Sequence, residues 1–262
     1  MGLGDDLMAV GDAYAIYKKT GKKVCIGKST ARPAQSPMYK NLDFLEQDPC
    51  WSANGAVIHF ESFTGKRPYI DYRKSSSSNQ VLFPDYRPKP GVIQFTEEEK
   101  AQANQMVPYE PGSRRIYVEP HVKGTYSDQN KRWPWEYWIE LVRELKAAGH
   151  QVVQLSRPEL SGLPFIPRMG SEDVRVSLAA MRACDVLVCS EGLLHHAAAA
   201  LKVPAVVIWG ARTDPKILGY EGQLNLTSGT DYCGSRTKCQ HCQEAMDRIT
   251  PAQVQEAIED LL

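Results

Sequence analysis

The clearest hydrophobic pattern in the chain runs from residue 185 to residue 210. Val186–Cys189 is a short apolar run typical of a buried strand, Leu193–Leu201 has the composition of an apolar helix, and Ala205–Trp209 is a second apolar run. Two such strands joined through a helix predict a βαβ unit in a parallel sheet that is covered on both faces.

The same alternation of strands and helices continues on both sides of this unit. Further strands are predicted at Arg115–Glu119, Gln151–Leu155 and residues 225–227. Amphipathic helices are predicted at Trp135–Ala148, Val174–Cys184 and Pro251–Leu262. The second half of the chain is therefore expected to form a regular α/β domain.

The first half is less regular. A glycine-rich turn opens a helix that ends at Gly21, and a short strand follows at Lys23–Ile26. Between residues 28 and 90 the periodicity is weak, and we expect loops with short strands at Ala56–Phe60 and Gln80–Phe83. Gly91–Phe95 is predicted as a strand, followed by a helix that Thr96 caps. Residues 108–113, rich in Pro and Gly, mark a boundary that divides the chain into lobes at 1–110 and 111–262.

Composition and charge narrow the class of protein. The chain has 262 residues, of which 42% are hydrophobic and 24% are charged, so it can fold as one large or two modest domains. Lys+Arg 31 balances Asp+Glu 31, and this neutrality argues against a nucleic-acid partner. No apolar run approaches the roughly 18 residues of a membrane span, and no secretory leader is evident, so we expect a cytoplasmic protein whose seven cysteines form no disulfides.

A candidate anion site lies in the turn of the central βαβ unit. Ligands of parallel sheets bind beyond the carboxyl ends of the strands, where helix N-termini present free N–H groups. The turn Ser190–Gly192 occupies such a position, so we expect it to bind an anion, most simply a phosphate. The alternative is an ordinary βαβ connection with nothing bound.

Asp5 and Asp6 lie at the start of the first predicted helix. Their simplest role is helix capping. The functional alternative is a carboxylate at a cleft, where it could act as a general base.

Four segments together resemble glycosyltransferase family 9, the family of lipopolysaccharide heptosyltransferases. Residues 2–6 look like its N-terminal Gly-Asp loop, and residues 131–134 followed by Trp138 are similar to its Lys-x-Trp-Pro segment. Residues 190–195, with the alanines, Val-Pro and Trp-Gly that follow, resemble its Asp-Thr-Gly-x-x-His helix, and residues 242–254 resemble its C-terminal segment.

This resemblance implies an α/β fold of the GT-B type, with two Rossmann-like lobes, of which the N-terminal one is reduced here. It also implies an inverting glycosyltransferase that requires no metal. The donor would be a nucleotide sugar, ADP-heptose or a relative, and the acceptor a lipopolysaccharide core or another glycan or glycolipid, met through a transient contact with the inner-membrane surface. The alternatives are a transferase with a protein or modified nucleic-acid acceptor, and a non-catalytic relative that binds a nucleotide or sugar.

The resemblance also implies roles for individual residues. Asp5 corresponds to the family's catalytic base, with Asp6 as its rival, and Lys131 to its phosphate-binding lysine. Without the resemblance, Lys131 would be a solvated lysine before a helix. The other implied donor-site residues are Tyr126 and Ser127 through their hydroxyls, Ser190, Glu191, Gly192 and Leu193 through the turn, and the family histidine His195.

Two of these positions depart from the expected pattern. Ser190 and Glu191 replace the family's Asp and Thr, and an exposed glutamate there would repel a diphosphate unless it turned to a hydroxyl. His195 lies on an alanine-rich helix, so it can either contact the ligand or be a buried histidine of the core. The neighbouring His196 is no stronger candidate for a ligand contact.

A cysteine cluster near the C-terminus is a candidate structural metal site. Cys233, Cys239 and Cys242 lie within ten residues, and the last two have the spacing of metal ligands, for zinc or iron. His241 lies between two candidate ligands, where we expect that it can hardly join them, and no clear fourth ligand follows. A catalytic metal is not expected.

Overall fold

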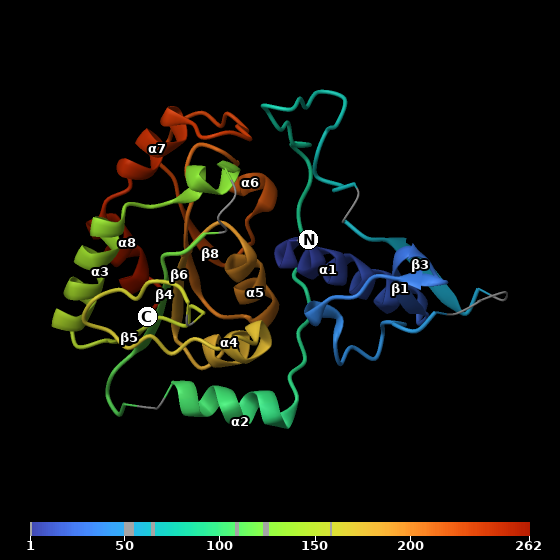
Figure 1. The fold of residues 1–262 in the computed structure, drawn as a ribbon, viewed down its shortest axis with the longest axis horizontal. Helices are drawn as coiled ribbons and strands as arrows, with labels where there is room; N and C mark the ends of the chain where they lie inside the picture. Colours follow the sequence, from blue (N-terminus) through green and yellow to red (C-terminus); the bar gives the residue numbers. More distant parts are fainter. Residues whose placement is uncertain (1, 50–54, 64–65, 108–109, 123–125, 158) are drawn as a thin grey trace.

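The computed structural model describes residues 2–49, 55–63, 66–107, 110–122, 126–157 and 159–262. Two lobes lie side by side, each with its own β-sheet (Figure 1). Within these residues, no helix is both long enough and apolar enough to cross a lipid bilayer.

The C-terminal lobe is built on a five-stranded sheet. Its strands are β4 (Arg115–Glu119), β5 (Gln151–Val153), β6 (Val186–Ser190), β7 (Ala205–Ile208) and β8 (Gln223–Leu226). All neighbouring strands are parallel, in the order β5-β4-β6-β7-β8. This is the order of a doubly wound α/β sheet, whose direction of winding reverses between β4 and β6. The strands predicted in this half are confirmed.

Helices cover both faces of this sheet, which explains why its strands are apolar throughout. Val186 and Val188 of β6 pack with α3 (Trp135–Ala147) and α8 (Pro251–Glu259), while Leu187 and Cys189 face α4 (Val174–Met181) and α5 (Leu193–Leu201). The predicted helices are therefore confirmed. Three shorter elements, none of which the sequence analysis predicts, complete the lobe: η2 (Tyr126–Lys131), α6 (Pro215–Leu218) and α7 (Gln240–Asp247).

The N-terminal lobe is smaller and its sheet is mixed. It contains α1 (Leu3–Thr20), β1 (Lys23–Ser29), β2 (Arg32–Pro33), η1 (Pro37–Tyr39) and β3 (Val57–Glu61). β1 pairs in parallel with β3 and antiparallel with β2, so the sheet is only partly Rossmann-like. Gly21 ends α1 in the left-handed conformation (φ 68°), where glycine is favoured, and the predicted helix and its following strand are confirmed.

Two strands predicted in this half are wrong. Residues 91–95 form no strand, because they pass across α1 instead of pairing with a strand edge. A Cβ on Gly11 would lie 2.3 Å from the Lys89 carbonyl oxygen, and one on Gly91 would lie 2.7 Å from the Leu7 carbonyl oxygen. The two glycines thus let a helix and an extended segment touch through their backbones. Residues 80–83 form no strand either, since Leu82 makes only an isolated bridge to Ile70.

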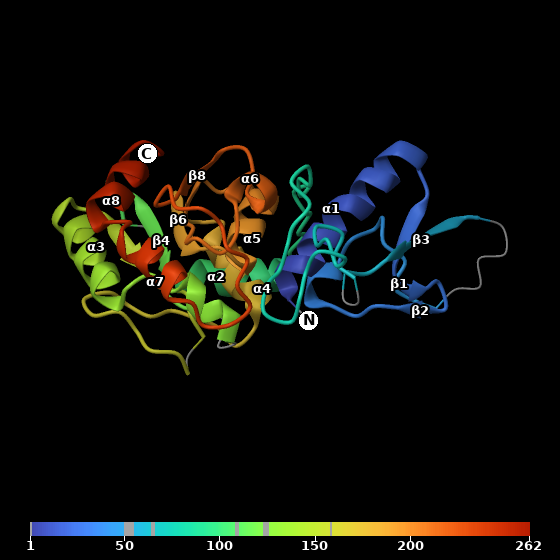
Figure 2. The same cartoon turned by 90° about the horizontal axis from the view of Figure 1, so that it is seen from above.

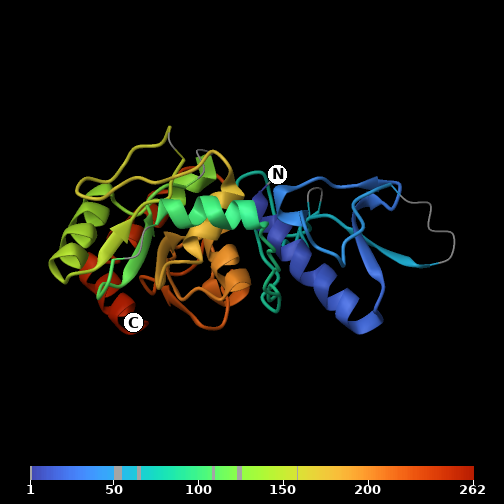
Figure 3. The same cartoon turned by 90° about the horizontal axis from the view of Figure 1, so that it is seen from below.

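A buried arginine joins the two lobes. Thr96 caps α2 (Glu97–Met106) as predicted, and α2 packs against α4 (Figures 2 and 3). The Arg175 guanidinium on α4 is fully buried and donates to both carboxylate oxygens of Glu99, at 2.6 and 3.0 Å. It also donates to the carbonyl oxygens of Pro37, at 2.9 Å, and of Gln94. Since α2 precedes residue 110 yet packs on the C-terminal lobe, a division at residue 110 stays a prediction.

Replacing Arg175 is expected to destabilise the protein strongly. Arg175→Met leaves the Glu99 carboxylate and two carbonyl oxygens without their donor, which costs about 3–5 kcal/mol in the free energy of unfolding. Denaturant unfolding of this variant should be compared with that of Arg182→Met, which removes an exposed arginine seven residues further along, at the C-cap of the same helix. Equal stabilities of the two variants would contradict this account.

Candidate functional site

The first turn of α1 lies against the first turn of α5. A Cβ on Gly4 would lie 2.7 Å from Cδ2 of His196 and 3.6 Å from Cα of Leu193, so only glycine allows this approach without displacing the histidine. Because Asp5 and Asp6 follow Gly4 directly, this contact places two carboxylates next to the turn that begins α5. The helix N-cap is Gly2, and neither aspartate caps the helix through its side chain.

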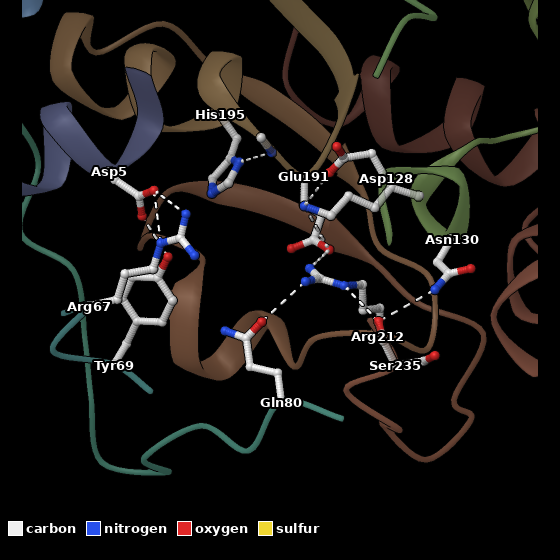
Figure 4. Close-up of polar contacts among 12 residues, drawn as sticks. Asp5, Arg67, Tyr69, Gln80, Asp128, Asn130, Glu191, His195, Arg212 and Ser235 are labelled. Atoms are coloured by element: carbon white, nitrogen blue, oxygen red, sulfur yellow. Dashed lines mark hydrogen bonds and ion pairs between the residues drawn. The ribbon is translucent and has the colours of Figure 1, made fainter. Parts of the chain in front are cut away.

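Asp5 is held by an arginine and a tyrosine from one loop. Its carboxylate accepts hydrogen bonds from Nε of Arg67, at 3.0 Å, and from the Tyr69 hydroxyl, at 2.6 Å, and Nη2 of Arg67 lies 2.9 Å from the carboxylate in an ion pair (Figure 4). Burial, and then the Asp5 charge, raise the pKa of Tyr69, so the phenol keeps its proton and donates it. Arg67 and Tyr69 lie where the sequence has weak periodicity, and no sequence signal identifies them.

Asp6 bonds to residues at the start and end of η1. It accepts hydrogen bonds from Oγ of Ser36, at 2.7 Å, and from the Tyr39 hydroxyl, at 3.1 Å. Ser36 is also the N-cap of η1, so Asp6 fixes η1 against α1. Burial raises the pKa of Asp6 above its ordinary value.

Across from α1, two cations surround one buried carboxylate. Glu191 lies 3.4 Å from Nζ of Lys131 and 3.7 Å from Nη1 of Arg212, and Arg212 donates to Oε1 of Gln80 at 3.2 Å (Figure 4). The expectation that Glu191 is exposed is wrong: only 6% of it is accessible, because the two cations compensate its burial. Nζ of Lys131 also lies 4.0 Å from Asp128.

Arg212 belongs to none of the sequence motifs that predict the site. It follows β7, at the carboxyl edge of the sheet where the Ser190–Gly192 turn also lies. The same rule that identifies that turn would have identified Arg212 as a charged residue at the ligand-binding edge.

His195 closes the start of α5. Its Nδ1 accepts a hydrogen bond from the Gly192 N–H at 2.8 Å, so its proton is on Nε2, which donates to the Leu218 carbonyl oxygen at 3.3 Å. Burial lowers the pKa of His195 to about 4, so the ring is neutral at pH 7. Both ring nitrogens and the Gly192 N–H therefore have partners within the protein, and the N–H groups of Glu191 and Leu193 are the remaining donors predicted for an anion.

Ser190 has an unused hydroxyl at the same turn. Its Oγ is buried and has no hydrogen-bond partner among the described residues. Because buried polar groups are nearly always bonded, this hydroxyl is a candidate contact for a ligand. Tyr126 and Ser127 belong to η2, but their side chains lie outside the described part of the structure.

The cysteine cluster differs from its prediction in one respect. Ligand atoms of Cys233, Cys239 and Cys242 lie together with one of His241, all within 4.8 Å of one another. The expectation that His241 cannot join the cysteines is therefore wrong, since the start of α7 turns its ring toward the thiols.

The two lobes and the charged site at the carboxyl edge of a doubly wound sheet define the GT-B class of architecture. Residues 78–252, well over half of the chain, match the model of glycosyltransferase family 9 (heptosyltransferase). The chain therefore belongs to glycosyltransferase family 9. No curated protein sequence matches it.

Solved structures share the fold at low sequence identity. The family 9 glycosyltransferase from Veillonella parvula has a TM-score of 0.67 and 14% identity, over 100% of this chain and 94% of that one. The iron-containing dodecameric glycosyltransferase TibC from enterotoxigenic E. coli has a TM-score of 0.50 and 18% identity, over 67% of this chain and 50% of that one. For ADP-heptose LPS heptosyltransferase II from E. coli the values are 0.48 and 21%, over 65% and 53%. The chain thus spans about half the length of the two E. coli proteins.

The buried histidine pair is expected to make stability depend on pH. The folded-state pKa values of His195 (about 4) and His196 lie below the ordinary value of 6.5, chiefly because of burial. Their stabilising contribution is complete above pH 6.5 and is lost as the pH falls toward the folded value. Each histidine should lower the free energy of unfolding by about 1.4 kcal/mol per pH unit in that window.

This dependence can be measured by denaturant unfolding between pH 6.5 and 5, above the range where most carboxylates titrate. His195→Gln, whose side-chain oxygen can still accept the Gly192 N–H, should show a shallower dependence than the wild type. His150→Gln, outside the pair, is the control. An unchanged slope in His195→Gln would show that the ring is already protonated in the folded protein.

Proposed function

We propose that this protein is an inverting glycosyltransferase that moves a heptose-like sugar from an ADP-sugar to a glycan acceptor. The observation that carries the proposal is the placement of the acidic start of α1 beside the Ser190–Gly192 turn and its two cations. The heptosyl part rests on the description of the family, and the ADP-sugar on the resemblance of the donor-site segments. The acceptor proposed is a lipopolysaccharide core or another surface glycan.

The donor diphosphate would bind between Lys131 and Arg212. Both cations lie near the Glu191 carboxylate, and Lys131 also lies near Asp128. An entering diphosphate would form ion pairs with Lys131 and Arg212 in place of Glu191. Charge that is already fixed in place stabilises the diphosphate as it departs. The Ser190 hydroxyl would add a further contact, and the proposed reaction requires no metal ion.

Asp5 is the proposed base. It would take the proton of the acceptor hydroxyl while that oxygen bonds to the anomeric carbon and the bond to the diphosphate breaks on the opposite face, so ADP leaves with the electron pair. Arg67 must first release the carboxylate, which is feasible because 43% of its side chain is accessible. Asp6 bonds Ser36 and Tyr39 and would position α1 rather than take part in the chemistry.

The Asp5–Arg67 ion pair also favours a second candidate function. A carboxylate held by a charged hydrogen bond and an ion pair from one guanidinium is a poor proton acceptor as long as the pair persists. In a protein that only binds a nucleotide or sugar, this pair would never open. Both functions share the donor site, and turnover distinguishes them.

Removing either cation is expected to weaken ADP binding. Lys131→Ala and Arg212→Ala each delete a charged hydrogen-bond donor to the diphosphate, which corresponds to a loss of about tenfold to a hundredfold in affinity. Isothermal titration calorimetry with ADP measures the effect. Lys18→Ala, at the exposed far end of α1, is the control. Unchanged affinity in both variants would place the diphosphate elsewhere.

Removing the base is expected to abolish transfer without loss of the donor. Asp5→Asn should reduce ADP release in the presence of a glycan acceptor by about a hundredfold to ten-thousandfold, with ADP affinity kept. Asp12→Asn, which removes another partly buried α1 carboxylate, is the matched control. Full activity in Asp5→Asn would exclude Asp5 as the base, and no transfer by the wild type with any heptose-bearing acceptor would favour the binding function.

A further inference from the structure

Three thiols converge at the start of α7. Sγ of Cys233 lies 3.3 Å from Sγ of Cys242 and 4.0 Å from Sγ of Cys239. These separations are far longer than the roughly 2.0 Å of a disulfide bond. They are close to the roughly 3.8 Å expected between two thiolates on one tetrahedral metal whose metal–sulfur distances are about 2.3 Å. The thiols thus have the spacing of metal ligands.

His241 supplies a fourth ligand. Its ligand nitrogen lies within the same 4.8 Å group as the three sulfurs. Its Nδ1 is buried and has no hydrogen-bond partner among the described residues. A ring with one nitrogen next to three thiols and a buried Nδ1 without a partner has the environment of a metal ligand rather than of a core histidine.

Backbone N–H groups point at the sulfurs. The N–H of Ser235 lies 3.5 Å from Sγ of Cys233. The backbone groups of His241 and Cys242 also hydrogen-bond to Sγ of Cys239. Three thiolates this close would repel one another, and a shared cation removes that repulsion.

We infer that Cys233, Cys239, His241 and Cys242 form a tetrahedral structural metal site, for which zinc is the expected ion. Three thiolates and one imidazole are a recognised zinc donor set, and four protein ligands close the coordination shell. Binding releases the thiol protons to solvent, so the affinity should fall as the pH is lowered.

The site would fix the loop that supports the donor-site cations. The Ser235 carbonyl oxygen in this loop accepts a hydrogen bond from Nε of Arg212 at 3.2 Å (Figure 4). The Thr237 carbonyl oxygen accepts one from Nδ2 of Asn130 at 2.7 Å. Asn130 in turn accepts the Cys239 N–H at 2.9 Å and directly precedes Lys131. The inferred metal site is independent of the proposed transfer reaction. Its effect on donor binding rests on the proposed function.

The same loop also touches the segment that follows the N-terminal sheet. The N–H of Gln80 donates to the Gly234 carbonyl oxygen at 2.8 Å, and the N–H of Arg236 donates to the Ser78 carbonyl oxygen at 2.9 Å. Gly234 has φ 65°, and a Cβ there would lie 2.0 Å from the Gln80 carbonyl oxygen. A metal bound to this loop would therefore fix both Gln80, through Gly234, and Arg212, through Ser235.

Metal content of the full chain, purified without a metal-affinity tag from zinc-supplemented cells, tests the inference. Mass spectrometry of the digested protein should find one zinc ion per chain. Cys233→Ser and Cys242→Ser should lose it, while His241→Cys should keep it with four thiolates. Cys184→Ala, a buried cysteine outside the cluster, is the matched control and should keep it.

Cobalt substitution provides a spectroscopic test. The wild type should show the visible bands of tetrahedral Co²⁺ with thiolate ligands, and His241→Cys should shift them. Where a cysteine variant fails to fold, stripping zinc from the wild type with a chelator should lower its melting temperature, and added zinc should restore it. Neither readout needs a sugar donor, so a failure here is distinct from a failure of the proposed function.

Two outcomes would overturn the inference. A wild-type protein that holds no zinc after desalting, or one whose zinc persists in Cys233→Ser and Cys242→Ser, would show that these residues form no zinc site. Iron bound at the same stoichiometry would overturn the assignment of zinc.

Discussion

The close contact between the first turns of α1 and α5 is the constraint on which the site depends. Gly4 leaves room for the His196 ring, and any larger residue would push the two helices apart. The contact joins the acidic start of the N-terminal lobe to the Ser190–Gly192 turn of the C-terminal lobe. The hydrophobic core continues across it, from α1 to α4 and α5, and the buried Arg175 holds the same lobes together through Glu99.

The charges buried at the junction between the two lobes compensate one another. The interior around α5 contains two neutral histidines and one buried glutamate, and the charge of the glutamate is compensated by Lys131 and Arg212. The Glu191 carboxylate keeps these two cations close together, and in the proposed function a donor diphosphate would take up their charge. The loop that contains Cys233 and Cys239 holds Arg212 in place, because the Ser235 carbonyl oxygen accepts a hydrogen bond from its guanidinium.

Most of the C-terminal lobe could be predicted from the sequence, because strands buried on both faces have a strong apolar pattern and helix termini carry their own signals. The helix start at Thr96, in the first half of the chain, carries the same kind of signal, and Thr96 caps α2 as predicted. The segment at 91–95 was mistaken for a strand because an extended backbone packed on a helix and one paired in a sheet share the same local composition. Only the backbone contacts of Gly11 with Lys89 and of Gly91 with Leu7 decide between them.

The candidate site likewise contains some residues that sequence motifs identify and others that only the fold brings together. Lys131, Glu191 and the two aspartates were found through motifs, but their partners were not. Arg67, Tyr69 and Gln80 come from a segment without periodicity, and their roles depend on how the chain folds back on α1 and on the C-terminal lobe. The burial of Glu191 could not be predicted without Arg212. The participation of His241 likewise depends on the direction of the first turn of α7, which the spacing of the cysteines does not reveal.

A crystal structure of the protein with ADP would test the central claim most directly. The account predicts that the diphosphate lies within hydrogen-bonding distance of Nζ of Lys131 and the guanidinium of Arg212, at the Ser190–Gly192 turn and on the side that faces Asp5. ADP bound elsewhere, with both cations still paired to Glu191, would contradict it.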